Sequence, residues 1–349
     1  MKRILVVIPG LSGGGAEKVA RLLVSHQVSH FEIHILTFSA EKLPNKNIFL
    51  HQIKKRKGIF DALSLTFEIY RLIKRVHFVG IVSHLTYTNT VTAIAAYLTN
   101  FRGRVILVHH IVGLPDYSKL FNLVVQWAYK KYTVVAVSLE IRQSLIGRIK
   151  KLNNCVVIEN PIQFPDSSHC SDFRREKFSL LAIGRYSPQK NYPFMFRMLS
   201  MLPMPYTLTV FGSGDREKFQ RLATEMNIES RITLNDFVDF KSLQIAYCKA
   251  GCFIMTSDYE GEPLALLEAA SLGIPVLGRA TPGLRSALER VGGLMPDLDT
   301  EHEFKELVLR VKEQASPHSA AAEWMQVHTP SYASHRYCIL IQERVLFDF

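Results

Sequence analysis

Cysteine is scarce in this sequence of 349 residues, and long apolar runs are missing. The five cysteines form no Cys-x-x-Cys pair, and their odd number predicts reduced thiols of an intracellular protein rather than a disulfide framework. Cys248 and Cys252 are spaced to share a helix face as buried thiols. No window approaches the roughly 18 to 20 apolar residues of a membrane-spanning helix. The short apolar run before Pro9 indicates a first strand and not a signal peptide.

Two common nucleotide-binding signatures are also missing. A glycine-rich turn with Gly13, Gly14 and Gly15 follows the first strand, but it does not fit Gly-x-Gly-x-x-Gly in phase. No acidic residue closes the second strand near Phe38, so a dinucleotide site is not expected. The absence of Gly-Lys-Ser/Thr excludes a P-loop. Small residues at this turn either let a ligand approach the backbone or serve the turn itself.

Composition and periodicity predict two α/β domains. The chain is 48% hydrophobic and 21% charged, which excludes disorder, and it is too long for one average core. Short runs rich in Val and Ile alternate with helical segments, the pattern of doubly wound parallel sheets. Strands are expected near residues 3–8, 31–38, 79–84, 104–109, 132–137, 155–158, 179–184, 206–211, 252–255 and 275–277. We expect an N-terminal domain over residues 1–163, a second domain over 164–329, and a last helix over 330–349 that packs back on the first.

The surplus of positive charge lies entirely in the N-terminal half. Residues 1–163 carry 22 Lys and Arg against 8 Asp and Glu, a net +14, while the rest carries 20 against 23, or −3. Two amphipathic stretches, residues 59–78 and 117–132, combine aromatic and basic side chains. Such helices either adsorb to anionic lipid or cover the sheet with their apolar faces.

Charged residues in the second half gather after predicted strands. Arg185 and Lys190 follow one strand, and cations at such a strand end can clamp a diphosphate. After another strand, Glu260 and Glu262 precede a helix that contains Glu268. Carboxylates accept hydrogen bonds from sugar hydroxyls, and free amides at a helix start bind phosphate. The pattern therefore predicts a nucleotide-sugar site.

These motifs resemble the retaining glycosyltransferases of the GT-B fold, in particular glycosyltransferase family 4, which builds bacterial surface glycans. The resemblance spans SGGGAEKVARLL, VAVSLEI, IENPI, IGRYSPQKN, VFGSGDRE and EGEPLALLEAASLGIPV. It implies two Rossmann-like domains facing across a cleft. It also implies transfer of a hexosyl or N-acetylhexosaminyl group, with retention, to a hydroxyl of a lipid-linked oligosaccharide or glycolipid. The product would enter lipopolysaccharide, O-antigen or capsule.

The resemblance also implies roles for individual residues. Arg185 and Lys190 would bind the donor diphosphate, Glu260 the transferred sugar and Glu268 the ribose. His110 would lie beside the transferred sugar and the acceptor, whereas His109 is expected to be structural. The remaining residues expected at the donor are Gly13, Gly14, Gly15, Gly212, Gly214, Phe237, Val238, Leu264 and Ala265. Glu262 departs from the family pattern, so it either contacts the donor or points outward.

Cofactor, partner and location follow from the same resemblance. No metal or other cofactor is expected, and Asp297-Leu298-Asp299 is interpreted as surface. The expected partners are a nucleotide sugar, a lipid-linked glycan acceptor and the anionic inner face of the cytoplasmic membrane, with no nucleic acid. Two other readings stay open: a GT-B sugar-nucleotide epimerase, and an inactive sugar-nucleotide-binding subunit.

Overall fold

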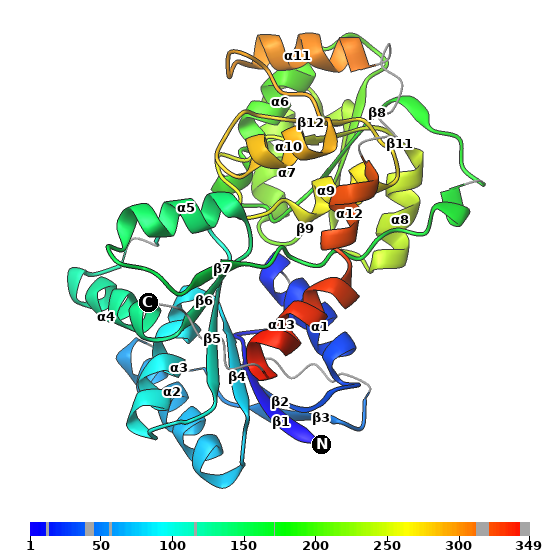
Figure 1. Cartoon of the computed structure of the whole chain (residues 1–349). Coiled ribbons are helices and arrows are strands. Elements are labelled where there is room, and N and C mark those ends of the chain that lie inside the picture. Colours follow the sequence, from blue (N-terminus) through cyan, green and yellow to red (C-terminus); the bar gives the residue numbers. More distant parts are fainter. Residues whose placement is uncertain are drawn as a thin grey trace. The chain divides into compact units, whose positions relative to one another are not determined.

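The computed structural model describes residues 1–11, 14–38, 45–55, 58–114, 117–170, 172–311 and 321–342. The chain divides into unit 1, formed by Met1–Pro161 with Val327–Phe349, and unit 2, formed by Ile162–Gln326 (Figure 1). The boundaries thus lie within three residues of the expected 163 and 329. Each unit has its own parallel sheet and its own covering helices, so the predicted fold class, two doubly wound α/β domains, is confirmed.

Unit 1 contains a seven-stranded sheet in the order β3-β2-β1-β4-β5-β6-β7, in which every pairing is parallel. Its strands are β1 (Lys2–Val7), β2 (Phe31–Thr37), β3 (Ile48–Gln52), β4 (Gly80–His84), β5 (Arg104–His109), β6 (Thr133–Ala136) and β7 (Cys155–Val157). The inner strands are almost continuously apolar because helices cover both faces of the sheet. The strand order reverses between β1 and β4, and we call that position the switch point of unit 1.

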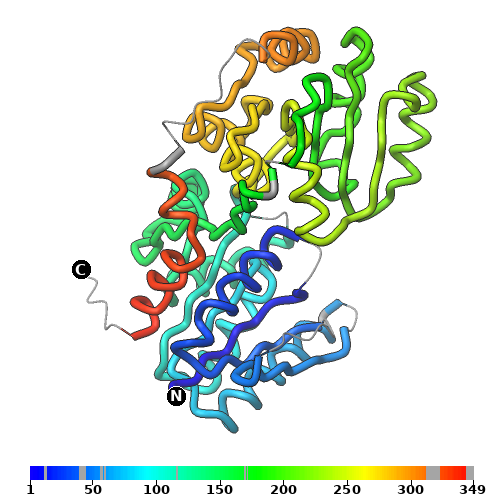
Figure 2. Tube along the Cα trace, turned by 90° about the vertical axis from the view of Figure 1, so that its right-hand side faces the viewer, coloured from blue at the N-terminus to red at the C-terminus, as the bar shows by residue number. Residues whose placement is uncertain are grey.

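In the described part of unit 1, six helices cover this sheet. They are α1 (Gly15–Gln27), α2 (Ile59–Arg75), α3 (Thr86–Leu98), α4 (Lys119–Lys131), α5 (Leu139–Arg148) and α13 (Pro330–Gln342). Right-handed crossovers place α2, α3 and α4 together on one face and α1 on the other (Figure 1). Helix α13, drawn in red, packs along α1, drawn in blue (Figure 2), so the last described helix belongs to unit 1.

Unit 2 contains a five-stranded parallel sheet in the order β10-β9-β8-β11-β12. Its strands are β8 (Glu176–Ile183), β9 (Thr207–Gly212), β10 (Ile232–Asp236), β11 (Ala250–Met255) and β12 (Val276–Gly278). The order reverses between β8 and β11, which is the switch point of unit 2. Ligands of such sheets bind outside the carboxyl ends of the strands at this position.

The helices of unit 2 divide between the two faces of the sheet. They are η1 (Ser167–Cys170), η2 (Pro188–Lys190), α6 (Tyr192–Met201), α7 (Arg216–Glu225), η3 (Glu229–Arg231), α8 (Phe240–Lys249), α9 (Leu264–Ser271), α10 (Leu284–Val291), α11 (Glu301–Arg310) and α12 (Ala321–Val327), which ends in unit 1. Right-handed crossovers place α6 and α7 on one face, and α8 and α9 on the other. An aromatic core that includes Tyr192, Phe196 and Phe219 fills the α6/α7 side.

Two strands were missing from the sequence-based prediction. Strand β3 lies at an edge of the unit 1 sheet and β10 at an edge of the unit 2 sheet. Strand β3 has no buried residue and exposes Phe49 and Gln52, while β10 exposes Thr233 and Asp236, so neither has the continuous buried run that marks the inner strands. The prediction therefore found the centre of each sheet and omitted one edge.

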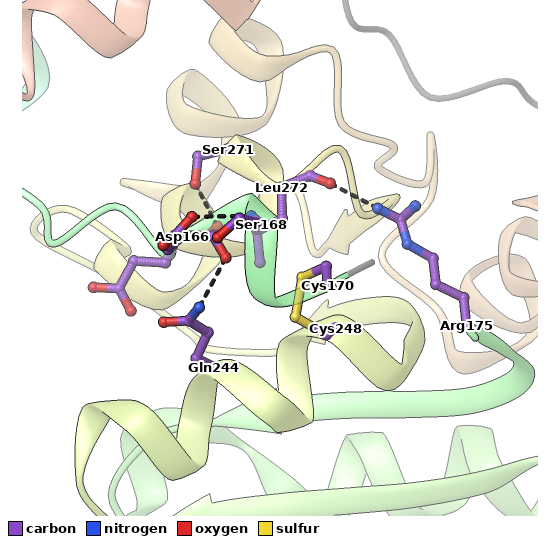
Figure 3. The surroundings of a disulfide bond; sticks show 9 residues. Asp166, Ser168, Cys170, Arg175, Gln244, Cys248, Ser271 and Leu272 are labelled. Atoms are coloured by element: carbon purple, nitrogen blue, oxygen red, sulfur yellow. Dashed lines mark hydrogen bonds between the residues drawn. A yellow bond between two sulfur atoms is a disulfide. The ribbon is translucent and has the colours of Figure 1, made fainter. Parts of the chain in front are cut away.

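The prediction of reduced thiols was wrong for two cysteines. Cys170 in η1 and Cys248 in α8 form a disulfide across 78 residues (Figure 3). Cys252 lies in β11 and therefore does not share a helix with Cys248; it is a buried free thiol, as are Cys155 and Cys338. Within the described residues, no helix has the length and hydropathy needed to cross a bilayer.

Candidate active site

The switch point of unit 2 joins two of the predicted residues. Lys190 ends the η2 turn after β8, and Glu260 lies in the loop after β11. The Lys190 ammonium is 2.6 Å from Oε1 of Glu260, and their side chains are only 16% and 9% exposed. An ammonium has three donors, so this ion pair leaves Lys190 further N–H groups for a second acceptor. The pair thus presents cationic and anionic groups at the ligand position of the fold.

Hydrogen bonds between two loops hold this ion pair in place. The hydroxyl of Thr256 donates to the carbonyl of Lys190 at 3.0 Å, and the amide of Asp258 donates to the carbonyl of Gln189 at 2.9 Å. The side chain of Asn191 donates to Oδ1 of Asp258 at 2.8 Å. These hydrogen bonds fix the η2 turn to the loop after β11, so the backbone holds Lys190 and Glu260 close to each other.

Glycines make room for both members of the pair. A Cβ at Gly184 would lie 2.7 Å from Cε of Lys190, so a side chain there would displace the lysine. Gly283 has a φ of +81°, and a Cβ there would collide with the carbonyl of Glu260. The amide of Glu260 also donates to the carbonyl of Pro282 at 2.9 Å. The sequence-based prediction did not include Gly283, although Thr-Pro-Gly marks a turn at that position.

Gly212 and Gly214 lie beside the same strand end. A Cβ at Gly212 would collide with the carbonyl of Gly184, and Gly214 has a φ of +116°. Gly214 forms a bridge with Tyr186, which follows β8. These two predicted residues therefore allow the end of β8 and the turn after β9 to approach each other closely.

Helix α9 carries Glu268 in its second turn and begins with Leu264 and Ala265. Glu268 is 2% exposed, and Oε2 accepts a hydrogen bond of 3.0 Å from the Tyr247 hydroxyl. The Leu264 amide donates to the carbonyl of Glu262 at 3.0 Å, so that donor is already used inside the turn.

The structure resolves the orientation of Glu262. Its side chain is 3% exposed, and Nη1 of Arg290 in α10 lies 3.5 Å from Oε1. Glu262 is therefore not turned outward, and the guanidinium of Arg290 offsets its charge. The carboxylate that departs from the family pattern thus has a cation of this chain beside it.

Three of the predicted donor residues lie at the surface of unit 2. Arg185 is exposed, and the structure gives its guanidinium no hydrogen bond or ion pair with the residues it describes. Phe237 is 55% exposed and follows β10, with the half-buried Val238 next to it. These side chains are accessible to a ligand, whereas Lys190, Glu260 and Glu268 form interactions inside the unit.

In unit 1 the glycine-rich turn precedes α1. Gly14 is the N-cap and Gly15 the first helical residue, whereas Gly13 lies outside the described residues. A Cβ at Gly14 would collide with the carboxylate of Glu17, which folds back over the N-terminus of the helix. A side chain at Gly14 would therefore displace the Glu17 carboxylate from the start of the helix.

His110 forms a pair with a histidine that the sequence-based prediction missed. His84 ends β4 at the switch point of unit 1, and its Nδ1 lies 3.1 Å from Nε2 of His110. The rings are stacked with centroids 5.3 Å apart. Burial lowers the pKa of His84 to about 3, and burial with the neighbouring histidines lowers the pKa of His110 well below its ordinary value. Both imidazoles are therefore neutral at pH 7. The position of His84 at a predicted strand end was the signal that could have identified it.

His109 has the structural environment expected for it. It is fully buried, and Nε2 donates to the carbonyl of Gly113 at 2.7 Å, while Nδ1 accepts from the Tyr129 hydroxyl at 2.9 Å. Burial lowers the pKa of His109 to about 4. Nε2 thus holds the loop that follows His110, and Nδ1 is used by Tyr129 of α4. Within the described residues, no three His, Cys, Asp or Glu side chains form a potential metal site.

Comparison with known proteins identifies the class. The family model described as glycosyltransferase family 4 matches residues 13–164, and the model described as glycosyl transferases group 1 matches residues 166–322. The chain is 32% identical over 148 residues to the lipopolysaccharide 1,6-galactosyltransferase of Escherichia coli K12, a match that spans 41% of each chain. It is 22% identical over 327 residues to a Campylobacter jejuni N-acetylgalactosaminyltransferase that acts on a diphospho-undecaprenol-linked sugar, covering 86% of this chain and 88% of that one.

Among solved structures, Anabaena Alr3699/HepE in complex with UDP and glucose superimposes with a TM-score of 0.82. The alignment has 17% identity and covers 97% of this chain and 98% of that one, which supports the fold. Two doubly wound units, each matched by a glycosyltransferase model, define a glycosyltransferase of the GT-B fold. The chain belongs to this family, and its named relatives are glycosyltransferases of bacterial surface glycans.

Proposed function

We propose that this enzyme transfers a sugar, with retention of the anomeric configuration, from a nucleoside diphosphate sugar to a hydroxyl of a lipid-linked glycan. The Lys190–Glu260 ion pair at the switch point of unit 2 carries the proposal, because it places a cation for a diphosphate beside a carboxylate for sugar hydroxyls. The named relatives act on lipopolysaccharide and on a diphospho-undecaprenol-linked sugar, which supports a glycan acceptor of the bacterial surface.

The residues of unit 2 would act on successive parts of the donor. Arg185, Lys190 and the Ala265 amide would stabilise the charge that develops on the departing diphosphate, so that the protein's own cations meet the electrostatic demand. Glu260 would hold the transferred sugar and Glu268 the ribose. Phe237 and Val238 would flank the base beside Gly212 and Gly214. From unit 1, Gly13, Gly14 and Gly15 would lie near the sugar and diphosphate, and His110 would lie beside sugar and acceptor.

A donor screen tests the first step of this proposal. Thermal unfolding is measured with UDP-, GDP- and ADP-sugars, because a ligand at 100 times its dissociation constant adds about 2.7 kcal/mol of stability. The expected result is stabilisation by one nucleotide class. Stabilisation by none of these donors would contradict a nucleotide-sugar site.

Variants of the ion pair test the catalytic assignment with that donor. Lys190→Met and Glu260→Gln should each lower kcat/KM by about 100- to 1000-fold, because each removes a charged group facing the reacting atoms. Lys177→Met, which changes a lysine at the start of β8, is the control and should keep wild-type kcat/KM.

Proton NMR of the first product should show the anomeric configuration of the donor, and inversion would overturn the proposed stereochemistry. Turnover after treatment with EDTA should be unchanged.

We also propose that unit 1 adsorbs to the anionic cytoplasmic face of the membrane. Large apolar side chains are exposed on neighbouring helices: Phe60, Leu63, Phe67 and Tyr70 of α2, Tyr97 and Leu98 of α3, and Leu120, Leu123 and Trp127 of α4. We call these residues the apolar surface. Basic residues on the same helices include Arg71, Lys74 and Lys131. Exposed apolar area beside cations is the combination that binds anionic lipid.

A vesicle-binding assay tests whether these helices bind lipid or are only exposed to solvent. The intact protein should sediment with vesicles that contain about 30% phosphatidylglycerol and should bind neutral vesicles more weakly. Phe67→Ser and Leu120→Ser should each weaken binding. Met201→Ser, which changes a residue of α6 in unit 2 that is 48% exposed, is the matched control. Equal losses in all three variants, or no binding at all, would contradict the assignment.

A further inference from the structure

We propose that Tyr247 is a positioning residue for the donor: its hydroxyl fixes the carboxylate of Glu268 in the orientation that receives the ribose of the nucleotide. The inference rests on the proposed function, because it takes Glu268 as the ribose ligand. Neither the sequence motifs nor the comparisons assign a role to Tyr247, which is in α8, outside the glutamate motif.

The Tyr247 hydroxyl has a single proton, which it shares between two acceptor oxygens of α9. It is 3.0 Å from Oε2 of Glu268 and 3.1 Å from the carbonyl of Ala265, and Tyr247 is completely buried. Burial and the adjacent Glu268 raise the pKa of Tyr247 well above its ordinary value, so the phenol keeps its proton and acts as a donor. One hydroxyl thus links the carboxylate and the first turn of the helix.

This contact limits how the Glu268 carboxylate can turn. A glutamate side chain has three rotatable bonds, and the last one is broad in its preferences. A hydrogen bond to Oε2 fixes that last rotation and so directs the other carboxylate oxygen. Pairing a hydroxyl-bearing ligand with an already oriented carboxylate costs less conformational entropy than ordering a mobile one. Tyr247 would therefore contribute to donor affinity without touching the donor.

Helix α8 is anchored independently of this hydroxyl. The Cys170–Cys248 disulfide joins the residue after Tyr247 to η1, and Nε2 of Gln244 donates to the carbonyl of Asp166 at 2.8 Å (Figure 3). At the far end of α9, the guanidinium of Arg175 donates to the carbonyls of Leu272 and Gly273 at 2.6 and 2.8 Å. Removal of one oxygen from Tyr247 should therefore leave both helices in place.

The ring of Tyr247 has its own packing partner. It lies against Phe253 of β11, with centroids 6.1 Å apart. Tyr247→Phe keeps this contact and removes only the hydroxyl. The variant is therefore expected to fold, so it reports on the Glu268 contact.

The test compares nucleotides with and without ribose hydroxyls. Binding of UDP, GDP and ADP and of their 2′,3′-dideoxy counterparts is measured by calorimetry on the intact chain. For the nucleoside diphosphate that binds wild type, Tyr247→Phe should raise Kd about 5- to 10-fold, as loss of one buried hydrogen bond to a charged group predicts. The dideoxy compound should bind the variant and wild type equally. In turnover, the variant should raise the donor KM with kcat within about twofold, because the ribose does not react.

Three control variants make the outcomes distinct. Glu268→Gln should also weaken only the ribose compound, and adding Tyr247→Phe to it should cause no further loss, because coupled residues are not additive. Tyr206→Phe removes another buried phenol oxygen in unit 2, just before β9, and should bind both compounds as wild type does.

The possible failures point to different conclusions. Equal weakening of the ribose and dideoxy compounds by Tyr247→Phe would reduce the residue to a structural role and overturn the inference. If Tyr247→Phe has no effect while Glu268→Gln does, the inference also fails but the ribose assignment holds. If no nucleoside diphosphate binds, or if Glu268→Gln binds both compounds as tightly as wild type does, the proposed function itself is wrong.

Discussion

At the switch point of unit 1 two imidazoles meet, His84 and His110, whereas at the switch point of unit 2 an ammonium meets a carboxylate, Lys190 and Glu260. Both pairs sit at the carboxyl ends of parallel strands, the position where this fold binds ligands. Since the pKa of His84 is lowered to about 3, the first pair is uncharged at pH 7. One architecture therefore presents a neutral polar edge in one unit and a charged edge in the other.

The net charges of the two units show the opposite order, because the unit with the neutral pair has the larger net charge. Unit 1 has 24 Lys and Arg against 10 Asp and Glu, a net +14, while unit 2 has 18 against 21, or −3. Among described residues, 13 of the 19 exposed large hydrophobic side chains belong to unit 1. Unit 2 places cations next to carboxylates, as in Lys190–Glu260 and Arg290–Glu262. The net charge of a unit is thus a poor guide to the charge at its site.

The largest expected effect is on stability and concerns unit 2 alone. Reduction of the Cys170–Cys248 disulfide should destabilise unit 2 by about 4.5 kcal/mol, the loop-closure value for a separation of 78 residues. Hydrogen exchange should show lost protection in β8 and β9, while β4 and β5 of unit 1 keep theirs. In the control variant Cys248→Ser, reductant should cause no further loss of protection. If the wild type shows the same protection in its oxidised and reduced forms, the prediction is wrong.

Acid should destabilise unit 1 instead. The folded-state pKa values of His84 and His109, about 3 and 4, lie below the ordinary 6.5, so the unfolded chain binds more protons between these limits. Stability is therefore unaffected above pH 6.5 and falls as pH decreases, by about 2 kcal/mol per histidine at pH 5 and about 4 kcal/mol together.

Hydrogen exchange at pH 7 and 5, corrected for intrinsic rates, checks this difference between the units. Protection of β4 and β5 should decline with acid more than that of β8 and β9. His84→Phe removes one of the titrating imidazoles and should reduce the decline by about 2 kcal/mol at pH 5. A decline of the same size in the variant would show that other groups cause it.

The sequence predicted the charged residues at the switch point of unit 2, but it did not predict the contacts that hold the surrounding helices and side chains in place. Lys190 and Glu260 could be placed because each follows an apolar run, and the carboxyl ends of neighbouring parallel strands meet at one edge. The contact of Tyr247 with Glu268 depends instead on how α8 and α9 pack, which no local pattern encodes. Cys170 and Cys248 are 78 residues apart, so their pairing likewise has no local signal.

The missed strands have a related physical cause. The hydrophobic run of an inner strand such as Arg104–His109 reports burial on both faces, whereas Ile48–Gln52 and Ile232–Asp236 lie at sheet edges and include exposed residues. His84 was overlooked for the opposite reason. It ends a fully buried strand, and a lone histidine on an apolar run reads as core until its neighbour across the sheet is known.

Substitutions at the two switch points should differ in their effect on turnover. Lys190→Met removes a charge and should cost about 100- to 1000-fold in kcat/KM. His84→Phe keeps a ring against His110 but removes a neutral hydrogen bond, so the expected loss is about 2- to 10-fold. His84→Asn, which restores a polar group, should recover part of it. A loss in His84→Phe as large as that in Lys190→Met would mean that the imidazole pair carries charge during the reaction.

The smallest effect concerns the surface charges, and the two units offer matched lysines. Lys74 of α2 lies 5.9 Å from the ring centre of Tyr70, and Lys218 of α7 lies 5.9 Å from that of Phe219. Both lysines are exposed on helices. If unit 1 faces anionic lipid, Lys74→Gln should weaken binding to phosphatidylglycerol vesicles by about 1 kcal/mol, roughly fivefold. Lys218→Gln should leave binding unchanged. Equal losses from both lysines would indicate non-specific attraction by the whole chain and would remove the distinction between the two surfaces.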